Sequence, residues 1–354
     1  MEDYVEKLWA TVKSWAAKNA QGFVCAYIPK ERTDLADSID TITPHRDYFR
    51  IWMSQMFLAK EREWFTEWYP AVHTSVELKF ASRTVKVSHV TGPDQEHSRG
   101  VKLDYAVTDL LPFAGGKIAI ESGLIALKGK NHISASIGIL QSFSSLVAAP
   151  LSQALDIAQK VSSGMDRLVG ANDGEVRLAF HREFVAKGGG GSELKPGYIA
   201  VIAASAAEVA EESLSVKNSQ LLKGSSAKPL EGFNYMLFRI EGRSERDDWR
   251  FPIIEEAINL AIESALKGKT KDAEDATTAA LTAVWQSPDL APQDRLRVVE
   301  AIRAEIAEAT GQGRGAVRKA GRTLDSIMKA RAMPLEAALR QPPLTREQVL
   351  GAVR

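Results

Sequence analysis

The chain has 354 residues, of which 45% are hydrophobic and 25% are charged; these proportions are typical of folded proteins and exclude extensive disorder. Lysine plus arginine equals aspartate plus glutamate at 45 each, so no net charge attracts nucleic acid or anionic lipid over a long range. The single cysteine, Cys25, excludes an intramolecular disulfide. The first residues lack the pattern of a signal peptide, and we expect a soluble cytoplasmic protein.

Residues 1–72 are predicted to form a helical, aromatic-rich segment. Residues 3–18 carry apolar side chains at helical spacing, and a strand-like run follows over 22–28. Residues 48–69 hold eight of the 26 aromatic residues, at three- and four-residue steps that predict a helix ending at Pro70. This spacing favours a core role; stacking on nucleobases and contact with a sugar or a protein partner are the alternatives.

Residues 73–250 are predicted to form a β-rich central domain. Val76, Leu78 and Phe80 alternate with polar residues, and Val85 and Val87 do the same, which predicts a hairpin of half-buried strands. The same signals predict further strands over 103–107, 117–127, 175–185, 198–203 and 235–241.

An apolar helix pair is predicted within this domain, near 137–169. No residue from Asn131 to Leu155 is charged, and Pro150 divides the stretch. The stretch is long enough to span a bilayer, which needs about 20 apolar residues, but it contains several Ser and Gln. A buried helix pair is one interpretation, and membrane insertion that depends on a trigger is the other.

Residues 251–354 are predicted to form a helical domain with a basic tail. Pro252 and Pro292 stand where a first helical turn accepts proline. The tail, 314–354, holds nine Lys or Arg against three Asp or Glu, so it is a candidate for binding nucleic acid or an acidic protein. It has no aromatic residue for base stacking, which favours a solvated helical face.

The order of these elements predicts an α+β fold, because strands followed by helices differ from the strict alternation of parallel α/β proteins. We expect a mainly antiparallel β central region with the embedded helix pair, a helical N-terminal segment and an all-helical C-terminal third.

Two near-matches to catalytic motifs are incomplete. Gly268-Lys269-Thr270 resembles the end of a phosphate-binding loop, but Glu263 stands where that loop needs glycine and the preceding segment is helical. This predicts a glycine that caps a helix. Asp104 and Glu121, on successive predicted strands, resemble the acids of a restriction-type nuclease, but Gly123 replaces the lysine of that pattern.

Other polar residues admit an enzymatic interpretation without requiring it. His181 and Glu183 share one face of a predicted strand and could form an acid–base pair or a surface hydrogen bond. The six histidines lack the spacing of zinc ligands, so no metal site is predicted. Cys25 lies in an apolar run without a nearby cation in the sequence, which indicates a core residue.

The densest group of charges lies where the last predicted strand leads into the Pro252 helix. Its residues could form an ion-paired connector that docks the helices onto the sheet, or a charged contact surface for a partner. A carboxylate pair that binds a metal is a third alternative. The candidate binding residues are Arg239, Glu241, Arg243, Glu245, Arg246, Asp247, Asp248 and Trp249.

The absence of a complete catalytic, metal or cofactor motif favours a non-enzymatic function. We expect an adaptor or accessory subunit of a bacterial multi-component system, such as a defence system, that acts by binding another protein. A membrane-perturbing effector that uses residues 131–155 is one alternative. A hydrolase or nuclease whose site is assembled from distant loops is the other.

Overall fold

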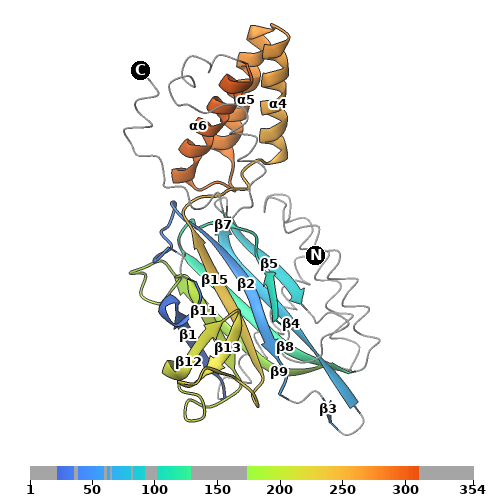
Figure 1. The fold of residues 1–354 in the computed structure, drawn as a ribbon, viewed down its shortest axis with the longest axis vertical. Coiled ribbons are helices and arrows are strands. Elements are labelled where there is room, and N and C mark those ends of the chain that lie inside the picture. Colours follow the sequence, from blue (N-terminus) through green and yellow to red (C-terminus); the bar gives the residue numbers. More distant parts are fainter. Residues whose placement is uncertain are drawn as a thin grey trace. The chain divides into compact units, whose positions relative to one another are not determined.

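The computed structural model describes residues 22–35, 39–59, 62–63, 66–80, 83–91, 102–128 and 174–310. By its internal contacts the chain divides into two units. The β-rich unit comprises Met1–Trp249 with Ser287–Arg295, and the helical unit comprises Arg250–Gln286 with Leu296–Arg354. Each unit is described separately below (Figure 1).

The first sheet of the β-rich unit has the strand order β1-β11-β15-β2-β6, and β7 also pairs with β2. All of its pairings are antiparallel. Its strands are β1 (Val24–Pro29), β2 (Tyr48–Phe57), β6 (Lys102–Ala106), β7 (Leu111–Pro112), β11 (Gly197–Ile202) and β15 (Tyr235–Arg243).

The second sheet has the order β10-β9-β8-β4-β3, and β5 pairs with β4. It is antiparallel apart from the two-residue pairing of β9 with β10. Its strands are β3 (Arg62–Glu63), β4 (Thr66–Phe80), β5 (Arg83–Thr91), β8 (Lys117–Lys128), β9 (Gly174–Val185) and β10 (Ser192–Glu193).

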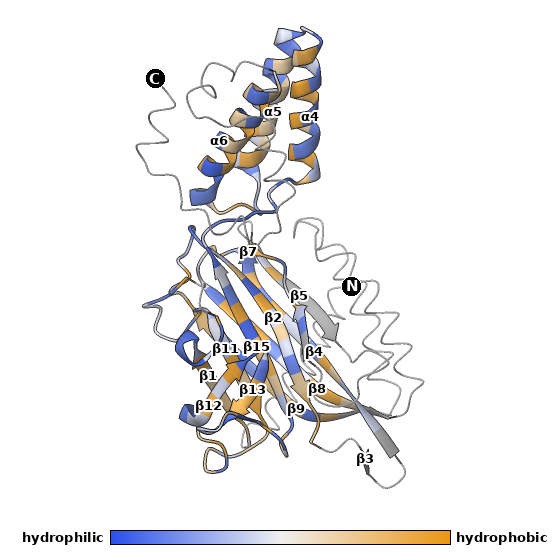
Figure 2. Ribbon diagram, in the orientation of Figure 1, coloured by the Kyte–Doolittle hydropathy of each residue, from blue (hydrophilic) through white to orange (hydrophobic). Residues whose placement is uncertain are grey.

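The main hydrophobic core lies between these two sheets. Phe238 of the first sheet and Phe180 of the second are both buried, and their ring centroids are 5.4 Å apart. The same core contains Ile51 and Met53 from β2. Alternate residues of each strand therefore face the other sheet, as in a β-sandwich, and hydrophobic residues recur along the strands (Figure 2).

A second core lies on the outer face of the first sheet. A three-stranded antiparallel sheet covers part of that face; its strands are β12 (Leu214–Lys217), β13 (Gln220–Lys223) and β14 (Lys228–Pro229). Leu221 of this small sheet clusters with Ala200 and Leu237 of the first sheet. Short 3-10 helices, η1 (Lys30–Arg32) and η2 (Glu211–Ser213), lie elsewhere in the unit.

Three α-helices are described in the C-terminal part of the chain: α4 (Pro252–Leu266), α5 (Thr270–Gln286) and α6 (Pro292–Ala309). Pro252 and Pro292 are each the first residue of a helix, as predicted. Gly268 has φ +72° and follows α4, and Lys269 N–H donates to the Ser264 carbonyl at 2.9 Å. This confirms the predicted capping glycine and excludes a phosphate-binding loop there.

The predicted fold class is wrong. The described chain is mainly β-sheet, and neither a helical N-terminal segment nor an all-helical C-terminal third is seen. The described helices end at Ala309, and the segment Ser287–Arg295, which includes the first turn of α6, belongs to the β-rich unit. The strands predicted after residue 73 are confirmed, including the hairpin in which Val76 pairs with Val87.

The helix predicted over residues 48–69 is also wrong, because β2 is covered on both faces. Tyr48 and Phe49 point to opposite faces of the sheet, yet both are fully buried. A strand buried on both faces lacks polar–apolar alternation, so its aromatic residues fell at helical spacing by chance. Pro70 does not end the element: it lies within β4 and pairs with Ala126 of β8. On the other side of β4, the pairing with β5 begins only at Val72.

Several predictions fall outside the described residues. They concern the helix over 3–18, the helix pair near 137–169, the uncharged stretch 131–155 and the tail 314–354. Within the described ranges, no helix is both long and apolar enough to cross a membrane.

Candidate functional site

The charged segment predicted as a binding site is divided into two parts by the structure. Arg239, Glu241 and Arg243 belong to β15. Because they are two residues apart, all three lie on the outer face of the first sheet. The remainder forms the loop after β15, in which Arg246 and Trp249 are buried while Glu245, Asp247 and Asp248 are exposed. These two parts have different surroundings and therefore different roles.

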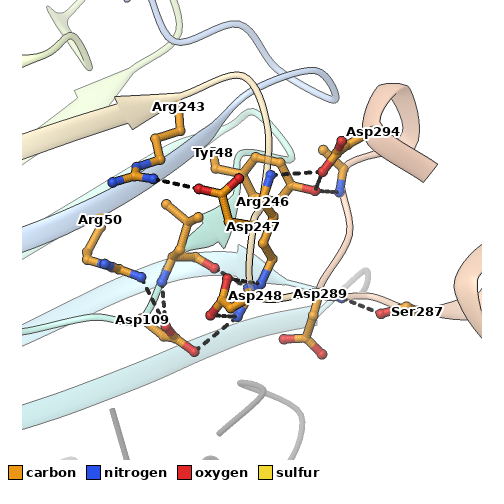
Figure 3. Close-up of polar contacts among 12 residues, drawn as sticks. Tyr48, Arg50, Asp109, Arg243, Arg246, Asp247, Asp248, Ser287, Asp289 and Asp294 are labelled. Carbon is orange, nitrogen blue, oxygen red and sulfur yellow. Dashed lines mark hydrogen bonds and ion pairs between the residues drawn. The ribbon is translucent and has the colours of Figure 1, made fainter. Parts of the chain in front are cut away.

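Arg246 is the centre of the buried part and is fully enclosed. Its guanidinium donates to the Leu110 carbonyl at 2.5 Å, and its Nε lies 3.0 Å from Asp248 Oδ1. A second nitrogen lies 3.4 Å from Asp109 Oδ2 (Figure 3). Burial raises the pKa of Asp109, and the positive charges of Arg246 and Arg50 oppose that rise. A buried arginine is tolerated when carboxylates and a carbonyl surround its guanidinium in this way.

Tyr48 and Asp294 connect this part to the segment Ser287–Arg295. The Tyr48 hydroxyl donates to Asp294 Oδ2 at 2.9 Å and accepts from Ala291 N–H at 2.8 Å. The backbone N–H of Arg246 donates to the same Asp294 oxygen at 3.0 Å (Figure 3). Burial, followed by the nearby Asp294 carboxylate, raises the pKa of Tyr48, so the phenol remains a donor. The buried part is thus a structural network.

The outer-face part is built around Trp52 of β2. The guanidinium of Arg239 lies 4.5 Å from the Trp52 ring centroid, and that of Arg50 lies 5.3 Å from it. Trp52 Nε1 donates to Glu241 Oε2 at 2.7 Å. Burial opposes ionisation of Glu241, but hydrogen bonds from Arg243 and Trp52 outweigh it and lower the pKa of this carboxyl. We call Arg50, Trp52, Arg239 and Glu241 the tryptophan row.

Arg239 differs from the other arginines near the row. Arg50 lies 3.6 Å from Asp109 and 3.9 Å from Glu241, and Arg243 pairs with Glu241 and with Asp247. Among the residues that the structure describes, no carboxylate lies within ion-pair distance of Arg239. Its Nε is buried without a hydrogen-bond partner. The stacked guanidinium of Arg239 is therefore available to an added anionic group.

A second polar group flanks Arg239 on the same face. Tyr198, the cross-strand neighbour of Arg239 on β11, shares a hydrogen bond with Ser219. Ser219 Oγ donates to Asp104 Oδ2 at 2.7 Å, while Asp104 Oδ1 is buried without a hydrogen-bond partner. Asp104 has φ +39°, a conformation that is uncommon for residues other than glycine.

The structure does not bring Asp104 and Glu121 together. Asp104 is on β6 of the first sheet and Glu121 is on β8 of the second, so they are not on neighbouring strands. Glu121 is fully buried and its Oε1 lies 2.7 Å from Nδ1 of His181. Glu183 instead forms an ion pair with Lys117 at 2.7 Å. The two acids of the nuclease-like pattern therefore do not form a pair, and His181 pairs with Glu121 rather than with Glu183.

Cys25 has a cationic neighbour that the sequence did not reveal. A terminal nitrogen of Arg182, on β9, lies 3.0 Å from the Cys25 sulfur. Burial raises the pKa of the thiol, although the positive charge of Arg182 opposes that rise. The thiol is therefore protonated at neutral pH, and the predicted core role suits it better than a nucleophilic one.

Comparison of the chain with known protein families, curated proteins and solved structures found no match. Across the described ranges, no group of three or more His, Cys, Asp or Glu side chains is arranged to hold a metal ion.

Sequence reasoning found Arg239 and Glu241 but missed Arg50 and Trp52. The helix predicted over residues 48–69 contains these two residues, although their two-residue step places them on one face of a strand. That step was a usable signal. The pairing of Trp52 with Arg239 across two strands was not readable, because it depends on sheet register.

Proposed function

We propose that this protein is a non-enzymatic adaptor or accessory subunit, and that the tryptophan row is its contact surface for a protein partner. The observation that supports this function is the Arg239 guanidinium, stacked on Trp52 without a carboxylate partner among the described residues. Tryptophan and arginine dominate the binding energy of protein interfaces, and here strands of one sheet hold both side chains in place.

The order of the row supports a preformed surface. Trp52 is fixed by its bond to Glu241, and Glu241 is fixed by Arg243. Binding would therefore lose little side-chain entropy, a loss that otherwise opposes association. The bacterial multi-component setting remains an expectation from sequence composition.

Site-directed crosslinking tests this proposal. Asp247 is exposed and pairs with Arg243 beside the row, so Asp247→p-benzoylphenylalanine places a photo-crosslinker there. The same substitution at Lys187, which is exposed in the loop after β9, serves as the control position. The crosslinked protein is identified by mass spectrometry, purified and titrated against the full chain by calorimetry.

We expect Trp52→Ala to weaken binding of the purified partner about tenfold or more, as for a hot-spot residue. Trp285→Ala removes a half-exposed tryptophan from α5 and should leave the affinity unchanged. Arg239→Gln repeats the test with a smaller packing change, in case Trp52→Ala does not fold. Equal affinity of the Trp52 and Arg239 variants and the unmodified chain would disprove the proposed surface.

A further inference from the structure

We infer that Arg239 receives the carboxylate of one aspartate or glutamate in an extended peptide segment of the partner. This inference rests on the proposed function and specifies its ligand. Arg239 offers planar, paired donors, which fit a carboxylate with two parallel hydrogen bonds.

The geometry around Arg239 leaves those donors accessible. Its Nε is buried, but its two terminal nitrogens are not among the enclosed and unpartnered atoms. Neither terminal nitrogen forms a hydrogen bond with any residue in the described part of the chain. Stacking on Trp52 at 4.5 Å holds the guanidinium plane, so a carboxylate meets donors that are already oriented.

The neighbouring charges favour a single carboxylate over a polyanion. Glu241 lies two residues from Arg239 on the same strand face. Asp104 is bonded to Ser219, which lies beside Tyr198, the cross-strand neighbour of Arg239. Nucleic acid presents closely spaced phosphates along its whole length, and these would meet both acids. A peptide can place one carboxylate on Arg239 and uncharged groups beside Glu241 and Asp104. The acidic residues around Arg239 therefore favour a peptide that has a single acidic residue with uncharged neighbours.

The Trp52 ring indicates which kind of residue should stand next to the peptide's acidic residue. The ring is half-buried, so its accessible part offers an apolar contact beside the Arg239 guanidinium. An aliphatic or aromatic side chain adjacent to the acid can cover it, and the added burial contributes roughly 25 cal/mol per Å² of apolar surface. The expected ligand is an acid followed or preceded by an apolar residue.

An array of immobilised 12-residue peptides of known random sequence tests this inference with the full chain. Five proteins are compared on the array: the unmodified chain, Arg239→Glu, Trp52→Phe, Trp52→Ala and Arg303→Glu. Arg303 is exposed on α6, so its reversal matches the change in net charge without touching the row. A fluorescent 20-nucleotide single-stranded DNA is titrated in parallel. Circular dichroism confirms that each variant is folded.

We expect the bound peptides to be enriched in an acid next to an apolar residue. Arg239→Glu should weaken their binding at least tenfold, while Arg303→Glu should not. Trp52→Phe keeps the aromatic ring and should retain most of the binding. DNA binding that is lost in Arg239→Glu would overturn the inference in favour of a nucleic acid.

The outcomes separate this inference from the proposed function. If peptides bind and Trp52→Ala abolishes binding, but the bound sequences are not acidic, the surface stands and the carboxylate is wrong. If binding is independent of both Trp52 and Arg239, both proposals are contradicted. If no peptide binds while the crosslinked partner still requires Trp52, only the carboxylate inference is contradicted.

Discussion

The phenol of Tyr48 and the carboxylate of Asp294 are joined by a buried hydrogen bond of 2.9 Å, although the residues are 246 positions apart in the chain. Tyr48 begins β2, and Asp294 lies in the first turn of α6. This bond, together with the Ala291 and Arg246 backbone donors, holds the segment Ser287–Arg295 within the β-rich unit. The loop between α5 and α6 is thus stabilised by residues of the sandwich.

Tyr48→Phe should destabilise the protein by about 1–3 kcal/mol, because it leaves a buried carboxylate oxygen and the Ala291 N–H with fewer partners. Urea unfolding followed by tryptophan fluorescence measures the loss. Tyr235→Phe is the matched control: Tyr235 is equally buried, and its hydroxyl forms no hydrogen bond with the described residues. Similar losses in both variants would mean that the Tyr48 bonds contribute little.

Arg246→Met should cost about 3–5 kcal/mol, since it removes the side-chain donor of the Leu110 carbonyl and one of the positive charges beside the buried Asp109. Arg246→Lys should recover only part of the loss, because an ammonium cannot reproduce the planar array of donors. Arg243→Met removes an exposed arginine from the same segment and should cost less than about 1 kcal/mol. The midpoint of urea unfolding distinguishes these cases, and equal losses at positions 246 and 243 would contradict the buried network.

How far the sequence predicted this fold depended on how each strand is buried. In β15, Met236, Phe238 and Ile240 all face the core. Their two-residue spacing is visible in the sequence and predicts a strand. In β2, the outer face carries Tyr48 and Trp52 in addition to the inner core residues, so the period disappeared. Local pattern cannot report a second covering layer that comes from distant residues, as Ala291 covers Tyr48.

The candidate site was predictable only where its residues are close in sequence. The charge density of 239–248 identified one strand and the loop after it. The partner of Glu241, however, is Trp52, 189 positions away, and the partner of the Arg246 backbone is Asp294. Such pairs arise from sheet register and loop packing, which a single sequence does not encode in any local spacing.

Gly242 gives a test of the packing beneath the candidate site. A Cβ at this position would lie 2.8 Å from Pro196 Cγ and 2.9 Å from Ile39 Cγ1, closer than van der Waals contact allows. Gly242→Ala should therefore cost about 1–3 kcal/mol by overpacking. Gly22→Ala has open space around it and should leave the thermal midpoint nearly unchanged. A neutral Gly242→Ala would show that β15 can shift away from Pro196 without cost.

His73 should make the stability of the protein depend on pH between about 6.5 and 4. The imidazole is buried, neither ring nitrogen has a hydrogen-bond partner among the described residues, and burial lowers its pKa to about 4. An unfolded chain binds the proton near pH 6.5. The unfolded state therefore takes up more protons in this window, so the free energy of unfolding is highest above pH 6.5 and falls as the pH drops, by about 3 kcal/mol in total.

Urea unfolding at pH 7.5, 5.5 and 4.5 measures this dependence. His73→Leu cannot be protonated, so its stability relative to the unmodified chain should rise as the pH falls. Val76→Ala, a core substitution on the same strand, should lower stability by a similar amount at every pH. If His73→Leu and the unmodified chain lose stability in parallel between pH 7.5 and 4.5, His73 is not the group responsible, and the acid sensitivity must come from the buried carboxyls.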